Sequence, residues 1–224
     1  MEKGKPNQDE SPPPTYTAVG SRPPFNLGLH ILSRLDQVTI QQTPDLVSLT
    51  SSVTTRDNEL IFQVKEDASP LVVELAGTDR PFNIGLYDER EQLAITLKRD
   101  PKIFRKKKVQ VFVGEELVSK VRLKRAFFGR LLHINNVEDK PVFIVTGPLM
   151  RWKTYTFKIL SVEGNPIGSI KRKWRGIGNE LFTEAEEYQL TFPQDLDVRY
   201  KAAVIAACLL IDIHYYTKYF GDSI

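Results

Sequence analysis

The sequence predicts a mainly β domain in which about twelve antiparallel strands close into a barrel around a hydrophobic C-terminal helix. From about Leu29, short segments rich in Val, Ile, Thr, Phe and Tyr recur about every ten residues, separated by Asp, Asn, Gly and Pro. No helical pattern lies between these segments, and closure into a barrel removes exposed sheet edges. The one strongly apolar helical segment comes last and is short enough to lie inside the barrel.

Twelve segments have the composition and alternation of strands. They cover residues 46–54, 60–65, 71–76, 82–87, 93–97, 108–113, 117–122, 131–135, 141–146, 155–160, 167–170 and 189–192. Two of the predicted hairpins resemble each other at an offset of 73 residues, 82–99 and 155–172, and each ends in Lys-Arg. This pattern favours a barrel made of two related halves over a chance likeness of two hairpins.

The predicted helix covers about residues 198–218, and Asp195 or Asp197 is positioned to cap its N-terminus. Residues 202–211 are apolar on all sides, which is typical of a buried helix. The apolar run ends at Asp212, whereas a helix that spans a bilayer needs about 20 apolar residues. A carboxylate at depth would add about 2.5 to 3.5 kcal/mol to membrane insertion. We therefore expect a helix inside the barrel, with a membrane span extended through Tyr219 as the alternative.

Residues 1–27 contain six prolines among polar residues and few apolar side chains, which predicts a disordered tail. Within it, Pro13, Pro14 and Tyr16 form a PPxY motif. A polyproline II segment of this kind docks in the aromatic groove of a WW domain. Binding to WW-domain proteins is one interpretation, and a chance match in a proline-rich segment is the other.

The net charge of +3 hides a strongly basic region. Residues 98–175 hold 20 Lys and Arg against 6 Asp and Glu, while the rest of the chain is acidic. Such a surplus suits anionic lipid or nucleic acid, and charge alone does not separate the two. The single cysteine, Cys208, excludes an intramolecular disulfide and favours a reducing compartment. We see no secretory signal and expect a location in the cytosol or facing it.

Several motifs resemble the phospholipid scramblase family in the same order along the chain. They are residues 32–37 (LSRLDQ), 80–82 (RPF), 147–148 (GP), 192–198 (FPQDLDV), 201–203 (KAA) and 207–212 (ACLLID). The resemblance covers about residues 28–218 and implies a tubby-like fold, with a barrel domain over 28–224. It also implies calcium-stimulated, ATP-independent movement of phospholipids between leaflets.

The resemblance places a calcium-binding segment with EF-hand-like spacing at residues 184–195, with Glu184, Glu186 and Asp195 as candidate ligands. Calcium prefers several hard oxygen ligands arranged around one centre. The segment departs from that pattern, because Tyr188 occupies the fifth position and Gln189 replaces the glycine of the sixth. A solvated acidic turn is the alternative to a calcium site.

A basic cluster is the candidate lipid-binding site: Lys98, Arg99, Lys102, Arg105, Lys106, Lys107 and Lys108. Many scramblases carry a cysteine cluster for palmitoylation in this neighbourhood, and this sequence has none there. Each basic residue near an anionic leaflet adds about 1 kcal/mol of attraction. We expect binding at the cytoplasmic face of the plasma membrane, with a solvated loop or a nuclear import signal as the alternatives. Lys120, Arg122 and Lys124 alternate with apolar residues and would extend this basic cluster.

No catalytic constellation is visible in the sequence. His30, His133 and His214 lack metal-ligand spacing, and the nucleophile motif G-x-S-x-G is missing. Cys208 lies in an apolar run, which is typical of a buried small hydrophobe. We therefore predict a phospholipid scramblase that is not an enzyme. The alternatives are a lipid-binding adaptor that recruits WW-domain proteins and a nuclear or nucleic-acid-binding regulator.

Overall fold

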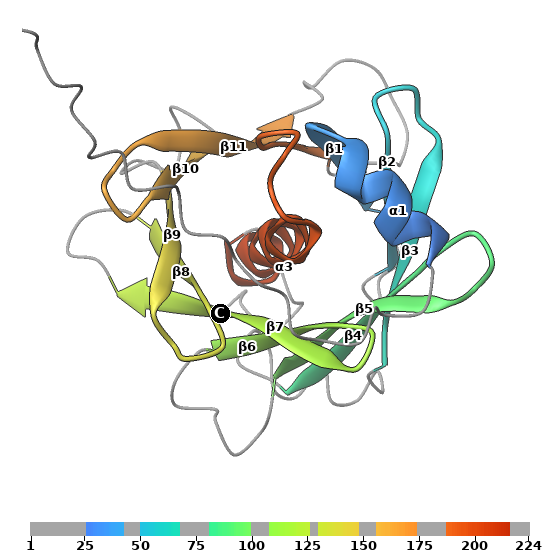
Figure 1. Ribbon diagram of the computed structural model, residues 1–224, viewed down its shortest axis with the longest axis horizontal. Helices are drawn as coiled ribbons and strands as arrows, with labels where there is room; N and C mark the ends of the chain where they lie inside the picture. The colour runs from blue at the N-terminus through green and yellow to red at the C-terminus, as the bar shows by residue number, and fades with distance from the viewer. Residues whose placement is uncertain are drawn as a thin grey trace, which may run out of the picture.

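The computed structural model describes residues 26–42, 50–67, 81–99, 108–125, 130–147, 156–173 and 187–215. Twelve antiparallel strands follow each other around a closed barrel, and β1 pairs with both β2 and β12 to complete it (Figure 1). The strands are β1 (Gln37–Gln42), β2 (Thr50–Thr54), β3 (Leu60–Glu66), β4 (Phe82–Tyr87), β5 (Leu93–Arg99), β6 (Lys108–Val113), β7 (Glu116–Arg125), β8 (Arg130–Asn135), β9 (Pro141–Thr146), β10 (Thr156–Ser161), β11 (Pro166–Lys173) and β12 (Glu187–Thr191). The predicted barrel is confirmed.

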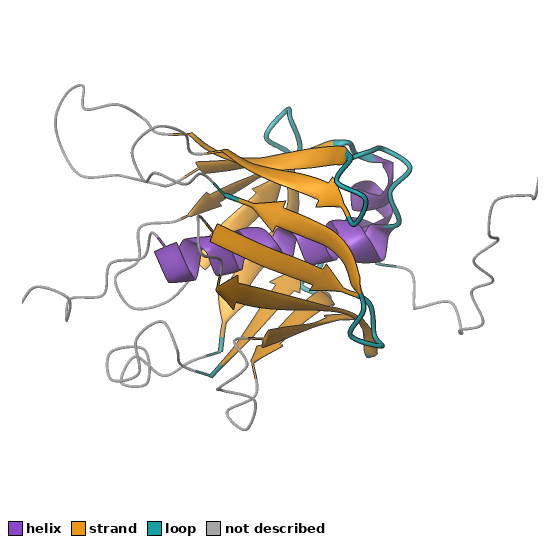
Figure 2. Cartoon of the chain, turned by 90° about the vertical axis from the view of Figure 1, so that its left-hand side faces the viewer, coloured by secondary structure: helices purple, strands orange, loops and turns teal. Residues whose placement is uncertain are grey.

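Helix α3 (Val198–Tyr215) runs through the barrel interior (Figure 2). Its residues from Lys201 to Ile213 are buried, with no more than 3% exposure, because inward-pointing strand residues surround the helix on all sides. This explains why the helix has no polar face between these residues. The predicted placement of the helix inside the barrel is therefore confirmed. None of the described helices combines the length and the apolar character needed to cross a bilayer.

The barrel has two different ends. We call one the turn end, because short turns at residues 55–59, 88–92, 114–115, 136–140 and 162–165 lie there, together with the start of α3. We call the other the helix-exit end, because α3 finishes there at Tyr215. Strands alternate in direction, so every odd-numbered strand from β3 to β11 finishes at the helix-exit end.

Helix α1 (Leu27–Arg34) and β1 were not among the predicted elements. Asn26 caps the helix by accepting a hydrogen bond from the backbone N–H of Leu29 at 3.0 Å. Gly28 lets α1 approach the barrel closely, since a Cβ there would lie 2.2 Å from the Phe62 ring. Eight residues of helix and a glutamine-rich strand give weak sequence patterns, and packing on the barrel forms both elements.

The two similar hairpins lie opposite each other in the barrel. β4 and β5 are six strands away from β10 and β11 in a ring of twelve. Their registers also correspond, because Ile84 pairs with Leu97 as Phe157 pairs with Ile170, each 73 residues further on. The predicted relation between the two hairpins thus extends to the detail of strand pairing.

Most predicted strands agree with the observed ones to within a few residues. The predicted strand at residues 71–76 lies outside the described residues, and β1 takes the twelfth place in the barrel. The predicted tail also lies outside them, except that Asn26 and Leu27 belong to the start of α1.

Candidate lipid-binding surface

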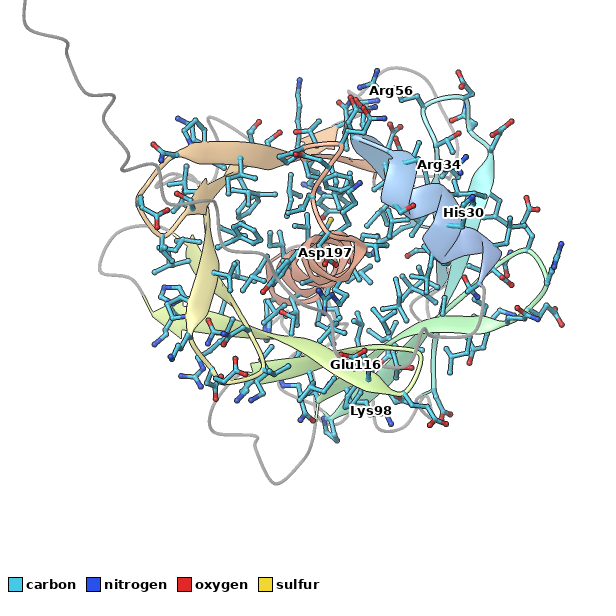
Figure 3. All side chains as sticks on the ribbon, viewed as in Figure 1. His30, Arg34, Arg56, Lys98, Glu116 and Asp197 are labelled. Atoms are coloured by element: carbon cyan, nitrogen blue, oxygen red, sulfur yellow. The ribbon has the colours of Figure 1, made fainter. Side chains whose placement is uncertain are left out.

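Lysines project from the outside of the barrel on β5, β7, β10 and β11. Lys98, Lys124, Lys158 and Lys171 are all exposed. They lie outside because their neighbours in sequence, such as Leu97 and Ile170, point into the core, and successive strand residues alternate in direction. Lys98 is labelled on the barrel wall in Figure 3. Its ammonium group lies 5.2 Å from the centre of the Phe112 ring. We call these four residues the basic face.

Part of the basic charge is neutralised within the barrel wall. Asp139, in the turn between β8 and β9, accepts a 2.5 Å hydrogen bond from Lys108 and lies 3.5 Å from Arg122 and 4.0 Å from Lys120. The Lys108 hydrogen bond is the main cause that lowers the pKa of the Asp139 carboxyl. Lys108, Lys120 and Arg122 are therefore held by one carboxylate, whereas the four lysines of the basic face have no ion pair with a described residue.

His133 lies beside this surface on β8. Burial, and then the charges of Lys124 and Arg122, lower the pKa of its imidazole. The side chain is consequently neutral at pH 7 and adds no charge to the surface. The direction of this shift is the one that a positive local field produces.

The structure describes three of the seven predicted lipid-binding residues, and it places them differently. Lys98 is exposed, Arg99 is only 3% exposed with its guanidinium over the Phe82 ring, and Lys108 is held by Asp139. The other four lie outside the described residues: Lys102, Arg105, Lys106 and Lys107. Pro13, Pro14 and Tyr16 of the predicted WW-binding motif also lie outside them.

The predicted calcium segment is partly described. Asp195 is exposed at the turn end, while Glu184 and Glu186 lie outside the described residues. Residues 187–191 form β12, which pairs on both sides and is extended instead of curled into a loop. A strand of this length separates Glu187 from the turn end by about 13 Å, several times the length of a calcium–oxygen bond. Within the described ranges no three acidic, His or Cys side chains gather as a metal site.

The Scramblase family profile matches residues 19–218. The chain belongs to the scramblase family. Human phospholipid scramblase 1 is 27% identical over 217 residues, which cover 87% of this chain and 68% of the human protein. Human phospholipid scramblase family member 5 is 25% identical over 224 residues, which cover 91% of this chain and 81% of that protein. A solved protein structure from Arabidopsis thaliana gives a TM-score of 0.47 at 16% identity, covering 79% of this chain and 91% of that one.

The motifs at residues 32–37 and 192–198, which are distant in the sequence, lie side by side in the structure. The buried ammonium group of Lys201 donates hydrogen bonds to the carbonyl oxygens of Ser33, Leu35 and Gln194 at 2.8, 2.7 and 2.7 Å, and to that of Leu32 at 3.3 Å. Three of these carbonyls lie at the end of α1, where helix carbonyls lack partners and cations are favoured. The motifs at 32–37 and 192–198 are therefore joined by one lysine, which fixes α1 to the start of α3.

The barrel interior of this scramblase-family chain also contains a polar cluster near the helix-exit end. Asp212, only 2% exposed, accepts hydrogen bonds from the hydroxyl of Tyr188 at 2.7 Å and from the amide of Gln42. Cys208 is buried one turn earlier, and burial raises the pKa of its thiol well above the ordinary value. The prediction that Cys208 is a buried small residue is confirmed, since a buried thiol with a raised pKa is a poor nucleophile.

The roles of Lys158, Lys201, Asp139 and the Tyr188–Asp212 pair were not predicted from the sequence. The side-chain hydrogen bonds and ion pairs of Lys201, Asp139, Tyr188 and Asp212 join residues 17 to 170 positions apart, except for those within the β8–β9 turn and between Lys201 and Gln194. A signal existed for Lys201 and Asp212, because each is a charged residue at the border of an apolar helix. Such residues are almost never buried without partners.

Proposed function

We propose that this chain is a phospholipid scramblase, which moves phospholipids in both directions between bilayer leaflets without ATP and is stimulated by calcium. The observation that carries the proposal is membership of the scramblase family over residues 19–218. The proposed step is non-covalent, so the protein lowers the barrier to headgroup transfer and breaks no bond. The proposed location is the cytoplasmic face of the plasma membrane.

The basic face supports a membrane role. Lys98, Lys124, Lys158 and Lys171 are exposed, and each contributes about 1 kcal/mol of attraction near an anionic leaflet. Their combined effect suits reversible adsorption, which weakens as salt screens the charges. The sequence also contains Lys102, Arg105, Lys106 and Lys107, the other members of the predicted lipid-binding cluster, which lie outside the described residues.

The barrel interior does not offer a lipid pathway while α3 is in place. The helix residues from 201 to 213 are buried among inward-facing strand residues, and protein interiors of this kind are closely packed. A phospholipid headgroup therefore moves along the outside of the barrel, or moves only after α3 is displaced.

The test is a reconstituted assay in which vesicles contain a fluorescent phospholipid in both leaflets and a reductant bleaches the outer leaflet. Scrambling makes the inner-leaflet label accessible as well. We expect complete bleaching with the protein and calcium, without ATP. Protection of the inner leaflet at saturating calcium would reject scrambling. If binding to anionic vesicles were retained in that case, the chain would act as a lipid-binding adaptor, with Pro13, Pro14 and Tyr16 as the WW-domain contact.

Calcium stimulation by Glu184, Glu186 and Asp195 is a part of the proposal that needs a test of its own, because the extended strand β12 lies between Asp195 and the other two residues in the chain. We expect Asp195→Asn to raise the calcium concentration for half-maximal activity about tenfold, because a carboxylate ligand loses its charge. Asp57→Asn is the matched control, since Asp57 is also exposed at the turn end and lies outside the segment. An unchanged calcium response in Asp195→Asn would remove Asp195 from the calcium site.

A further inference from the structure

Charges are sorted along the barrel axis. In the segments that connect elements at the turn end, twelve residues are acidic and three are basic. The acidic ones are Asp36, Asp57, Glu59, Asp88, Glu89, Glu91, Glu115, Glu138, Asp139, Glu163, Asp195 and Asp197, and the basic ones are Arg56, Arg90 and Lys140. The turn end is therefore the acidic end of the barrel.

The helix-exit end has the opposite character. Among the two residues that end each strand there, six with described side chains are basic and two are acidic, leaving aside Lys108, whose ammonium group is bound by Asp139 of the turn end. The basic ones are Lys65, Lys98, Arg99, Lys124, Arg172 and Lys173, and the acidic ones are Glu66 and Glu187. This sorting follows from the strand order, because an up-and-down barrel puts alternate connections at opposite ends. A chain that alternates acidic turns with basic strand ends therefore forms a barrel with one acidic end and one basic end.

The basic residues surround the helix-exit end instead of lying on one side of it. They come from β3, β5, β7 and β11, and Lys158 of β10 lies at the same level because it pairs with Thr146, the last residue of β9. The two hairpins related by the 73-residue offset carry Lys98 and Lys171 at corresponding positions on opposite sides of the barrel. A flat anionic surface meets most of these charges only if it approaches along the barrel axis.

We propose that the helix-exit end is the surface that docks on an anionic phospholipid bilayer, with the barrel axis and α3 directed toward the membrane and the acidic turn end facing away. This inference rests on the proposed membrane function and specifies its geometry. Charge complementarity identifies the partner, because the docking end is basic and the opposite end would be repelled by the same leaflet. The end of α3 then lies next to the bilayer.

The first experiment compares two variants of the full chain that remove the same charge from opposite ends. Lys124→Gln/Lys171→Gln acts at the helix-exit end and Arg90→Gln/Lys140→Gln at the turn end, and all four residues are exposed. We expect the first variant to bind phosphatidylserine vesicles about 25-fold more weakly, or about fivefold for each charge, and the second to change less than twofold. Thermal melting checks that both variants are folded.

Equal losses in the two variants would overturn end-on docking, because net charge would then explain binding. No loss in either variant would overturn it as well. A competition experiment adds a short DNA duplex to the wild-type chain bound to vesicles. Displacement of the chain from the vesicles by DNA at equal salt would favour a nucleic-acid partner and overturn docking on a bilayer. If scrambling persists while the two variants lose binding equally, the docking geometry fails and the proposed function stands.

The second experiment measures orientation directly. Cys208 is buried, so a cysteine introduced at the surface is the one that reacts with a dye. Thr146→Cys places the dye at the helix-exit end, and Glu163→Cys places it at the turn end, about 17 Å away along a strand. We expect a quencher attached to lipid headgroups to quench the dye at position 146 and leave the dye at 163 unchanged. Equal quenching, or stronger quenching at 163, would overturn the proposal.

Discussion

The hydroxyl group of Tyr188, on β12, donates a 2.7 Å hydrogen bond to Oδ1 of Asp212, on α3. Both residues are almost completely buried, at 1% and 2% exposure. The bond crosses from the barrel wall to the central helix, next to the end at which the helix leaves the barrel. It therefore fixes the end of α3, as Lys201 fixes its beginning.

Tyr188→Phe removes this donor while preserving the ring. A hydrogen bond to a buried charged group contributes about 1.5 to 3 kcal/mol, so we expect the free energy of unfolding to fall by that amount. Urea denaturation measures the loss. Tyr87→Phe is the control, because Tyr87 lies on the outside of the barrel and its change should cost less than about 0.5 kcal/mol. Equal stability of Tyr188→Phe and the wild-type chain would mean that the bond does not hold α3.

Lys201→Met tests the connection between α1 and α3. The substitution keeps the apolar stem and removes the ammonium group from four carbonyl oxygens, of which those of Leu32, Ser33 and Leu35 lie at the end of α1. We expect a loss of about 2 to 4 kcal/mol, because buried carbonyls lose their donors. Amide hydrogen exchange should accelerate in α1 before it does in the strands. Lys140→Met, at an exposed site, should change neither quantity, and unchanged exchange in α1 of the Lys201 variant would contradict the account.

Gly168→Ala tests the close approach of β11 and β12. A Cβ at this position would lie 2.0 Å from the carbonyl oxygen of Thr191, which is backbone and cannot rotate away. We expect destabilisation of about 1 to 3 kcal/mol or more, measured by thermal unfolding. Gly85→Ala is the matched control, because its Cβ would meet the outer end of the Tyr87 side chain, which can move. A larger loss at Gly85 than at Gly168 would contradict the packing described.

The pH dependence of stability tests the cluster that Asp139 forms with Lys108, Lys120 and Arg122. The hydrogen bond from Lys108 lowers the pKa of Asp139, so the carboxylate stabilises the fold above the pKa of the unfolded chain. This contribution is lost as the pH falls through the lowered pKa, that is, below about pH 4. Asp139→Asn should lower stability at pH 7 by less than about 1 kcal/mol, since the group is partly exposed, and should flatten the decline toward pH 2. Denaturant titrations at several pH values measure both effects, and an unchanged acid slope would show that the cluster is not coupled to folding.

Most of the barrel could be predicted because each strand carries its own local signal. The alternation in 82–87, 108–113 and 141–146 is complete within six residues, and the observed strands β4, β6 and β9 have these bounds. The apolar run before Asp212 likewise predicts the buried helix from local composition. Such signals persist because an inward-facing residue must be apolar wherever the barrel closes.

The surface could not be predicted in the same way. Arg99 and Lys98 are neighbours with the same charge, yet one is buried over Phe82 and the other is exposed, because strand residues alternate in direction. Lys108 looks like part of a basic run in the sequence, and its partner Asp139 lies 31 residues away. The axial sorting of charge becomes visible only when the order of the strands assigns each connection to an end.

Scrambling by this chain is tested by the rate at which inner-leaflet fluorescent phospholipid becomes accessible to a membrane-impermeant reductant in phosphatidylserine-containing vesicles. We expect rapid, ATP-independent exposure of the inner-leaflet label with the wild-type chain and calcium. We also expect a large decrease for Lys124→Gln/Lys171→Gln and a rate close to wild type for Arg90→Gln/Lys140→Gln. An inner leaflet that stays protected with the folded wild-type chain bound to the vesicles would contradict the central claim.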